Sequence, residues 1–465
     1  MPPFDTGHWQ ARLDELRARH RVPGAALAVL ADGVVHELAG GVLHRGTGVE
    51  ATADSVFPVG SLAKPYTATL VMRLADTGAL DLDAPVVGVL PEFATPDPSA
   101  TEAITVRQLL SHTGGVTNDF THDSGRGDDC LAKYVEAARD VALDLPPGAA
   151  YSYGSLGYVV LGRIVEVLTG GTWDRALKDL IFEPLGLGHS MTLPEEALRF
   201  RAAMGHLGGL GEDPVPAPVW DLMPRSAGPY GRVIVSAGDV ARFARMHLSG
   251  GLAPDGTRVL SSEAVAAMRR RVVDSPDKWS MSADGWGLGW ALYDWDGVTG
   301  FGHDGSTGTQ QSYLRVIPDA GVALVLLANS NTASRLYADL FAELLAELAG
   351  VRMPPPFAPP ANPPEVDITP WVGTYRREGV VTTVGRAAGG GARLRLEFVD
   401  GMREVVERMP DVPPWLEADL TPLSPTVFAV SGGVFGEDHV PVVFSTLTDG
   451  TPCVYVSMRA ARRTG

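Results

Sequence analysis

The amino-acid sequence predicts an α/β (α+β) region built on an antiparallel sheet with a helical insert, followed by a small all-β barrel. Strand-like segments lie near both ends of residues 1–350 with helical segments between them, so the sheet should assemble from distant parts of the chain. Seven prolines in the eleven residues 354–364 predict a stiff, extended linker rather than a packed element. Short alternating segments beyond it, separated by glycine- and aspartate-rich turns, predict the barrel. The expected regions are therefore 1–350, the linker 351–368, and 369–465.

The start of the chain predicts a helix and then a hairpin. Trp9, Leu13 and Leu16 recur at helical spacing, which indicates an amphipathic helix over residues 5–21. The apolar runs 25–30 and 34–38 flank Asp32-Gly33, a pair that is typical of a tight hairpin turn.

Helices dominate the middle of the first region. One is expected to begin at Ser61 and to end at Gly78. The patterns predict further helices over residues 156–168, 173–181, 237–248 and 262–270. They then predict strands over 309–317 and 322–329, and a last helix over 334–348.

Composition and charge exclude several classes of function. The 465 residues are 45% hydrophobic and carry a net charge of −17, with no basic cluster outside the last few residues, which argues against a nucleic-acid partner. The longest apolar run, residues 322–328, is too short to span a membrane. The first residues resemble no export signal, so we expect a cytoplasmic protein. Cys130 and Cys453 are expected to be free thiols.

Ser61 and Lys64 form the most informative pattern. Three residues are close to one helical turn, so both side chains lie on one face at the start of an apolar helix. The helix N-terminus favours an alkoxide and an oxyanion, and the lysine ammonium lowers the cost of removing the serine proton. Ser275 and Lys278 have the same spacing but lie in a polar stretch interrupted by proline, with no apolar helix behind it. This second pair shows that the spacing alone is not sufficient evidence for a nucleophile. The sequence therefore predicts acyl-transfer chemistry at Ser61.

Two downstream segments extend this constellation. Tyr153 lies on a loop that leads into the helix at 156, and we expect it to act as general base with a pKa lowered by nearby cations. Gly302-His303-Asp304-Gly305-Ser306 is expected to open the strand 309–317. A backbone N–H there would complete an oxyanion hole with the Ser61 N–H. His303 is expected to line the pocket as one of the catalytic residues, and Asp304 to be a turn residue.

These motifs resemble the penicillin-recognising serine enzymes, on the class C β-lactamase and D-aminopeptidase side. The family's SxxK, YxN and Lys/His-x-Gly motifs match Ser61/Lys64, Tyr153-Gly154-Ser155 and His303-Asp304-Gly305, in the same order. The resemblance implies a β-lactamase/transpeptidase-like fold, an oxyanion hole from the Ser61 and Ser306 N–H groups, and substrate binding at Ser155 and Gly305. Ser155 replaces the usual asparagine, and His303 replaces the lysine that holds the substrate carboxylate in β-lactamases, which argues against β-lactamase activity.

The second region also resembles a known module. Val372-Gly373-Thr374-Tyr375 is similar to the start of the lipocalin-like barrel carried by some D-aminopeptidases and by penicillin-binding-protein-type thioesterases, which release and cyclise nonribosomal peptides. This layout implies a peptidyl ester, thioester or amide as substrate, free or bound to a carrier protein, and no cofactor. Arg459, expected to end the last strand, is a candidate contact to that substrate. The alternative is a solvated basic tail with Arg462 and Arg463.

The residues leave three other functions open. A stand-alone D-aminopeptidase or carboxylesterase would use the same residues as a cyclase and differ only in whether water or an amine takes the acyl group. A non-catalytic binding protein on the same fold is a more remote alternative. A zinc enzyme is disfavoured, because the histidines form no HExxH or HxH pattern and His112 and His122 have no nearby ligand partners; we expect no metal.

Overall fold

The computed structural model describes residues 4–209, 211–221, 223–387, 391–407, 413–431 and 439–465. Within these ranges, nine strands form one antiparallel sheet in the order β3-β2-β1-β14-β13-β12-β11-β10-β9. Strand β1 pairs with β14, with Ala25 opposite Ala328, so the two ends of the first region meet in one sheet as expected. The strands are β1 (Gly24–Ala31), β2 (Val34–His44), β3 (Val49–Glu50), β9 (Val273–Asp274), β10 (Gly285–Trp286), β11 (Ala291–Trp295), β12 (Val298–Ser306), β13 (Gln311–Ile317) and β14 (Val322–Ala328).

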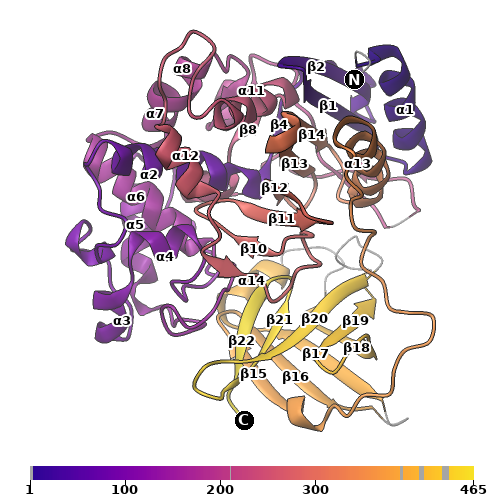
Figure 1. The fold of residues 1–465 in the computed structure, drawn as a ribbon. Helices are drawn as coiled ribbons and strands as arrows, with labels where there is room; N and C mark the ends of the chain where they lie inside the picture. Colours follow the sequence, from indigo (N-terminus) through magenta and orange to yellow (C-terminus); the bar gives the residue numbers. More distant parts are fainter. Residues whose placement is uncertain (1–3, 210, 222, 388–390, 408–412, 432–438) are drawn as a thin grey trace.

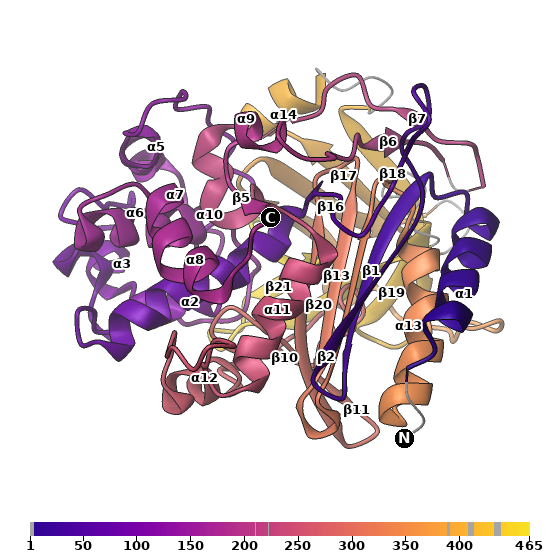
Figure 2. The ribbon, with the colours of Figure 1, turned by 90° about the horizontal axis from the view of Figure 1, so that it is seen from above.

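Helices cover both faces of this sheet. Helices α1 (Thr6–Arg19) and α13 (Ser334–Ala349) pack on one face, and α11 (Ala237–Leu248) packs on the other with the helical insert beyond it (Figure 2). Every residue of β1 and β14 is buried, because the central strands lie between two apolar layers.

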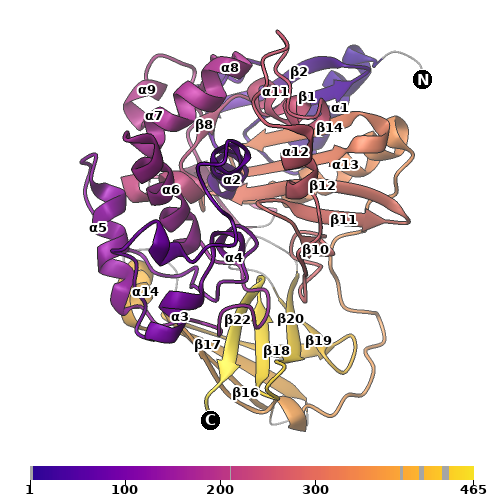
Figure 3. The same cartoon turned by 60° about the vertical axis from the view of Figure 1, so that its left-hand side comes forward.

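The helical insert surrounds α2 (Ala63–Asp76), which follows the short 3₁₀ turn η1 (Gly60–Leu62). Helix α2 lies beside α6 (Leu156–Thr169) (Figure 3) and also packs against α10 (Gly228–Gly231). The first ten residues of α2 are all buried. The sequence predicted one helix over 173–181. In the structure, α7 (Trp173–Leu177) is followed by a π-helical turn, η4 (Lys178–Phe182), which leads into α8 (Glu183–Leu185). The other described helices are α3 (Pro98–Ala103), α4 (Val106–Leu110), α5 (Cys130–Ala137), α9 (Pro194–Ala197) and α12 (Ser262–Met268).

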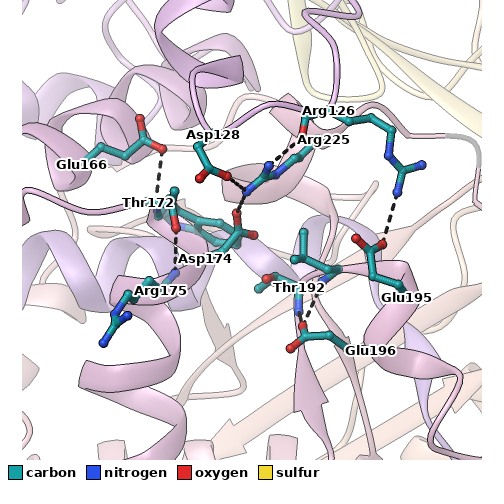
Figure 4. A network of polar contacts seen from close by, with 12 residues as sticks. Arg126, Asp128, Glu166, Thr172, Asp174, Arg175, Thr192, Glu195, Glu196 and Arg225 are labelled. Carbon is teal, nitrogen blue, oxygen red and sulfur yellow. Dashed lines mark hydrogen bonds and ion pairs between the residues drawn. The ribbon is translucent and has the colours of Figure 1, made fainter.

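A polar network ties the outer helices of the insert together (Figure 4). The Arg225 guanidinium pairs with Asp128 and Asp174 and donates to the Arg126 carbonyl. Glu166 accepts the Trp173 N–H, which joins the end of α6 to the start of α7. This network borders a polar groove of about 1000 Å³ on the outside of the insert.

The second region is a closed barrel of strands β15 to β22, which confirms the expected all-β barrel (Figure 1). Apolar side chains, among them Tyr375, Phe428 and Phe444, form its core. The strands are β15 (Gly373–Arg377), β16 (Val380–Arg386), β17 (Ala392–Phe398), β18 (Trp415–Pro422), β19 (Val427–Ser431), β20 (His439–Thr446), β21 (Pro452–Val456) and β22 (Arg459–Arg463), with helix α14 (Asp400–Glu407) between β17 and β18.

The proline-rich segment between the two regions has no helix or strand before the short turn η7 (Thr369–Trp371). It is nevertheless partly packed, contrary to the expectation of an unpacked linker. Val351 and Met353 are buried, and the Phe357 ring contacts the Trp279 ring of the first region.

Two smaller expectations concern the cysteines and the membrane. Cys130 and Cys453 are both buried free thiols, as predicted. None of the helices in the described part of the chain is long and apolar enough to cross a membrane.

Candidate active site

Ser61 and Lys64 meet at the start of α2, as their spacing predicts. Lys64 Nζ lies 3.2 Å from Ser61 Oγ and donates a second hydrogen bond of 3.2 Å to the Tyr230 carbonyl. The Lys64 side chain is fully buried. Burial, and then the positive charge of Arg459, hold the Lys64 pKa well below its ordinary value. Lys64 is therefore suited to be a neutral amine that accepts the Ser61 proton, rather than the ammonium inferred from the sequence.

Tyr153 lies beside this pair, with its ring centroid 4.7 Å from Lys64 Nζ. Its hydroxyl is buried and has no hydrogen-bond partner among the described residues. Burial raises the Tyr153 pKa, and the smaller opposing effects of Ser61 and Arg459 do not reverse this. The direction is opposite to the one expected for a general base, so the electrostatics favour a neutral phenol that donates a proton.

His112 supports the loop that carries Tyr153. Its ring lies 4.4 Å from the Tyr153 ring, and its Nδ1 accepts the Gly154 N–H at 3.2 Å. Burial, the largest cause, lowers the His112 pKa well below its usual value, which keeps the ring neutral and Nδ1 free to accept.

The segment Gly302–Ser306 does not open the strand β13, as the sequence suggested; it forms the end of the preceding strand β12. This end packs directly on the turn that carries Ser61. A Cβ on Gly60 would lie 2.4 Å from the Ser306 carbonyl oxygen, and one on Gly305 would lie 1.9 Å from the Val59 carbonyl oxygen. Only glycine allows this approach, and it brings the Ser306 backbone beside Ser61, where the proposed oxyanion hole requires it.

His303 and Asp304 exchange the positions expected of them, because neighbouring residues on a strand face opposite sides. His303 is buried between Tyr153 and Trp286 and does not line the cavity. Its Nδ1 donates to the Asp304 carbonyl at 2.6 Å, and burial lowers its pKa to about 3, so it carries no charge. Asp304, expected in a turn, faces the cavity from β12 instead and forms an ion pair with the fully buried Arg315.

Ser155 does not reach the cavity either. It is buried at the N-terminus of α6, and its hydroxyl donates to the Asn118 side-chain oxygen at 2.7 Å. The substrate-binding role inferred from the family motif is therefore not supported by its position.

Arg459 does reach the site, although it begins the last strand β22 rather than ending the one before it. Ser457 and Met458, both with positive φ, form the tight turn between β21 and β22. The Arg459 guanidinium carbon lies 5.7 Å from the Tyr153 ring centroid, and its Nε lies 4.0 Å from Asp119. Asp119 also pairs with Arg377 of β15.

The barrel turn is bonded to the loop that carries Tyr153. The Tyr153 N–H donates to the Met458 carbonyl at 3.1 Å, and the Ala460 N–H donates to Ser152 Oγ at 3.1 Å. The buried carboxylate of Asp277 accepts the Met458 N–H at 2.9 Å. Sequence reasoning missed Asp277 and Met458 because their roles depend on contacts between regions that no local pattern reveals.

The Ser61 turn, the Tyr153 loop, the end of β12, the linker and the barrel turn together line one cavity of about 340 Å³. Its wall combines polar groups of the first region with side chains from the linker and the barrel. Among its lining residues are Ser61, Tyr153, Trp279, Met281, Asp304, Gly305, Ser306, Arg315, Met353, Pro354, Pro356, Phe357, His439, Pro441, Met458 and Arg459. No group of three or more His, Cys, Asp or Glu side chains that could hold a metal ion occurs among the described residues.

The beta-lactamase family model matches residues 9–347, which include Ser61, Lys64, Tyr153 and Ser306. The chain belongs to the beta-lactamase family. Penicillin-binding protein 4 of Amycolatopsis lactamdurans is 63% identical over 377 residues, which cover 81% of this chain and 99% of that protein. The crystal structure of SurE has 30% sequence identity and a TM-score of 0.77 and covers 99% of both chains; SurE with D-Leu gives a TM-score of 0.74.

A more distant relative is the unguisins hydrolase ungD of Aspergillus violaceofuscus, which is 24% identical over 71% of this chain and 62% of that protein. The match to SurE extends over the barrel as well as the beta-lactamase region, because it covers 99% of both chains. The two-part layout expected from the sequence is therefore found in a solved relative.

Proposed function

We propose that this beta-lactamase-family serine enzyme releases a peptide from an ester or thioester and closes it head to tail through an acyl-enzyme at Ser61. The observation that carries the acyl-enzyme chemistry is the pair of half-buried Ser61 and fully buried Lys64, whose Oγ and Nζ lie 3.2 Å apart, with the Lys64 pKa lowered. A neutral lysine amine is the base that Ser61 needs, since no histidine lies among the residues that line the cavity beside Ser61 except His439 of the barrel.

In the proposed acylation, Lys64 Nζ takes the Ser61 proton while Oγ forms a bond to the substrate carbonyl carbon. The N–H groups of Ser61 and Ser306 stabilise the negative charge that develops on the carbonyl oxygen. The tetrahedral intermediate then expels the thiolate or alkoxide, which receives a proton from Lys64 or from the Tyr153 hydroxyl. In deacylation, the peptide's own amine forms the new C–N bond, loses a proton to the same groups, and Oγ leaves as the protonated serine.

Cyclisation is the favoured outcome for two reasons. The chain shares its whole two-part layout with SurE, and this layout resembles that of penicillin-binding-protein-type thioesterases that cyclise peptides. SurE has also been crystallised with D-Leu, which supports a substrate with a D-residue at the carbonyl end. Barrel residues such as Arg459 also line one side of the cavity, which limits the approach of bulk water to the acyl-enzyme from that side.

The test is product analysis with a short peptide thioester that carries a D-residue at its C-terminus and a free N-terminal amine. We expect the cyclic peptide as main product. Ser61→Ala should give none, whereas Ser275→Ala, the matched control, should behave as wild type because the Ser275 hydroxyl is occupied with the Asp277 carbonyl. Absence of acylation in the wild-type protein would contradict the proposal.

Linear acid as the sole product would favour the second candidate, a stand-alone peptide hydrolase. The similarity to an unguisins hydrolase supports that candidate. Both functions use the same acyl-enzyme, so the ratio of cyclic to linear product decides between them. A carrier-bound form of the same peptide tests whether the substrate is delivered by a carrier protein.

A further inference from the structure

The cavity at Ser61 has an apolar wall that the proposed chemistry does not use. Trp279 and Phe357 form its centre, with ring centroids 5.7 Å apart and planes inclined at 55°. Trp279 lies on the loop between β9 and β10, and Phe357 lies in the proline-rich segment between the two regions. Met281, Met353, Pro354, Pro356 and Pro441 of β20 complete the wall.

This wall is held in place before any substrate binds. The buried Asp277 carboxylate accepts the backbone N–H groups of Trp279 and Ser280 at 3.2 and 3.1 Å. The same carboxylate accepts the Met458 N–H of the barrel turn, so the Trp279 loop and the Arg459 turn are fixed to one group. Prolines 354, 355 and 356 restrict the backbone ahead of Phe357, which reduces the entropy that binding would otherwise cost.

The two aromatic rings are only partly buried, and both line the cavity. An apolar surface that is preorganised, partly open and continuous with a nucleophile is suited to bind part of the substrate. Charged groups of the cavity, such as Asp304 and Arg459, lie on other elements, β12 and β22.

We propose that Trp279 and Phe357 form a specificity subsite for an apolar side chain of the acyl part of the substrate. The side chain belongs to a residue upstream of the carbonyl that Ser61 attacks. This inference rests on the proposed acyl-enzyme function, and it adds that the linker segment itself selects the substrate.

The experiment measures kcat/KM for sets of peptide thioesters that differ only in having leucine or glycine at one of the three positions upstream of the C-terminal residue. Wild-type protein should prefer leucine at one position by about 10-fold or more, the range in which apolar pockets discriminate. Trp279→Ala and Phe357→Ala should each bring that ratio close to one. Trp415→Ala, which removes a half-exposed tryptophan from the outside of the barrel, is the matched control and should keep the wild-type ratio.

Labelling of Ser61 by a small fluorophosphonate and turnover of an acetyl thioester separate this inference from the proposed function. Both should be unchanged in the two subsite variants, because neither probe reaches the aromatic wall. If both fail in the wild-type protein, the acyl-enzyme function is wrong. If both succeed but the wild type shows no leucine preference at any position, or keeps its preference in Phe357→Ala, the subsite is wrong. Phe357 lies outside every helix and strand, so this variant decides the matter even if Trp279→Ala fails to fold.

Discussion

At the scale of single residues, the environment of Lys64 supports the proposed role of Ser61 as a nucleophile. A lysine near its ordinary pKa of 10.5 is charged at neutral pH and cannot accept a proton, whereas burial and Arg459 favour the neutral amine here. In the proposed mechanism, desolvation therefore allows Lys64 to act as the base for Ser61 without a histidine.

This environment predicts a specific pH profile. The rate of Ser61 acylation should rise as Lys64 loses its proton and should reach a plateau well below pH 10.5. Lys64→Arg should abolish acylation, because the guanidinium stays protonated at all accessible pH values. The measurement is the rate of fluorophosphonate labelling from acid to alkaline pH, and a profile that rises only near pH 10 would show that Lys64 is charged in the free enzyme.

The two neighbouring tyrosines should differ in their contribution. Tyr153→Phe should slow turnover by on the order of 10³-fold, since it removes the hydroxyl beside Ser61 that the proposed mechanism uses as a proton donor. Tyr151→Phe is the control, because the Tyr151 hydroxyl donates to the Met458 sulphur and Tyr151 is not among the residues that line the cavity, so its effect should be small. The measurement is kcat and KM for one thioester with both variants. A larger loss of turnover in Tyr151→Phe would assign the proton-transfer role to Tyr151 instead.

Lys64→Ala and Tyr153→Phe should each lower the rate of acylation, and the double variant should be little slower than either single variant, because both residues serve the same proton transfers. Comparison of the two single variants with the double variant tests this. Full multiplication would mean that the two groups act in separate steps.

The sequence could predict that Ser61, Lys64 and Tyr153 lie together, because local spacing and family motifs carry that information. It could not predict which of His303 and Asp304 faces the cavity, since that depends on the strand to which they belong. Asp119, Asp277 and Arg377 act through contacts with distant segments, and no pattern around them in the sequence indicates those partners.

At the scale of elements, the close packing of β12 on the Ser61 turn is what aligns the proposed oxyanion hole. The helices and strands that the sequence predicted in the first region lie close to their observed ranges, because their apolar periodicity is strong, but strands β3, β9, β10 and β11 of the sheet were not predicted. Two predictions were wrong. Residues 302–306 were assigned to the start of the following strand but form the end of β12. The single helix predicted over 173–181 is interrupted by the π-helical turn η4.

The packing of β12 predicts the effect of a single methyl group. Gly305→Ala would place a Cβ 1.9 Å from the Val59 carbonyl oxygen and must push β12 away from Ser61. We expect acylation to fall by about 10²-fold or more, comparable to the loss of one oxyanion donor. Gly188→Ala, where the added Cβ meets open space, should leave activity unchanged. Wild-type activity in Gly305→Ala would mean that β12 does not set the geometry of the site.

At the scale of the whole molecule, the barrel and the beta-lactamase region share buried polar contacts. Asp144 of the first region accepts the Glu378 N–H from the turn between β15 and β16, at 3.1 Å. Burial raises the Asp144 pKa to about 7. The sequence predicted both regions but not the contacts between them, because the composition of the linker indicated a spacer that separates two independent regions.

This contact predicts how stability depends on pH. The folded protein holds a proton on Asp144 that the unfolded chain, with an aspartate pKa near 3.8, releases, so the free energy of unfolding should fall as pH rises from about 4 to about 7. Asp144→Asn should reduce that fall and raise the Tm at pH 8, whereas Asp140→Asn, on an exposed carboxyl group, should not. The measurement is Tm at pH 5 and pH 8 for the three proteins, and an unchanged pH dependence in Asp144→Asn would contradict the prediction.

The hydrogen bond from Tyr153 to the Met458 carbonyl has a consequence for synthesis of the protein in the cell. A ribosome makes Ser61, Lys64, Tyr153 and Ser306 long before it makes the turn at Met458 and Arg459. The nascent chain therefore carries its nucleophile for some time without the segment that supports the Tyr153 loop. Peptide turnover should begin only after the barrel has been translated. A chain whose translation stops before the barrel would therefore contain Ser61 but should not turn over peptides.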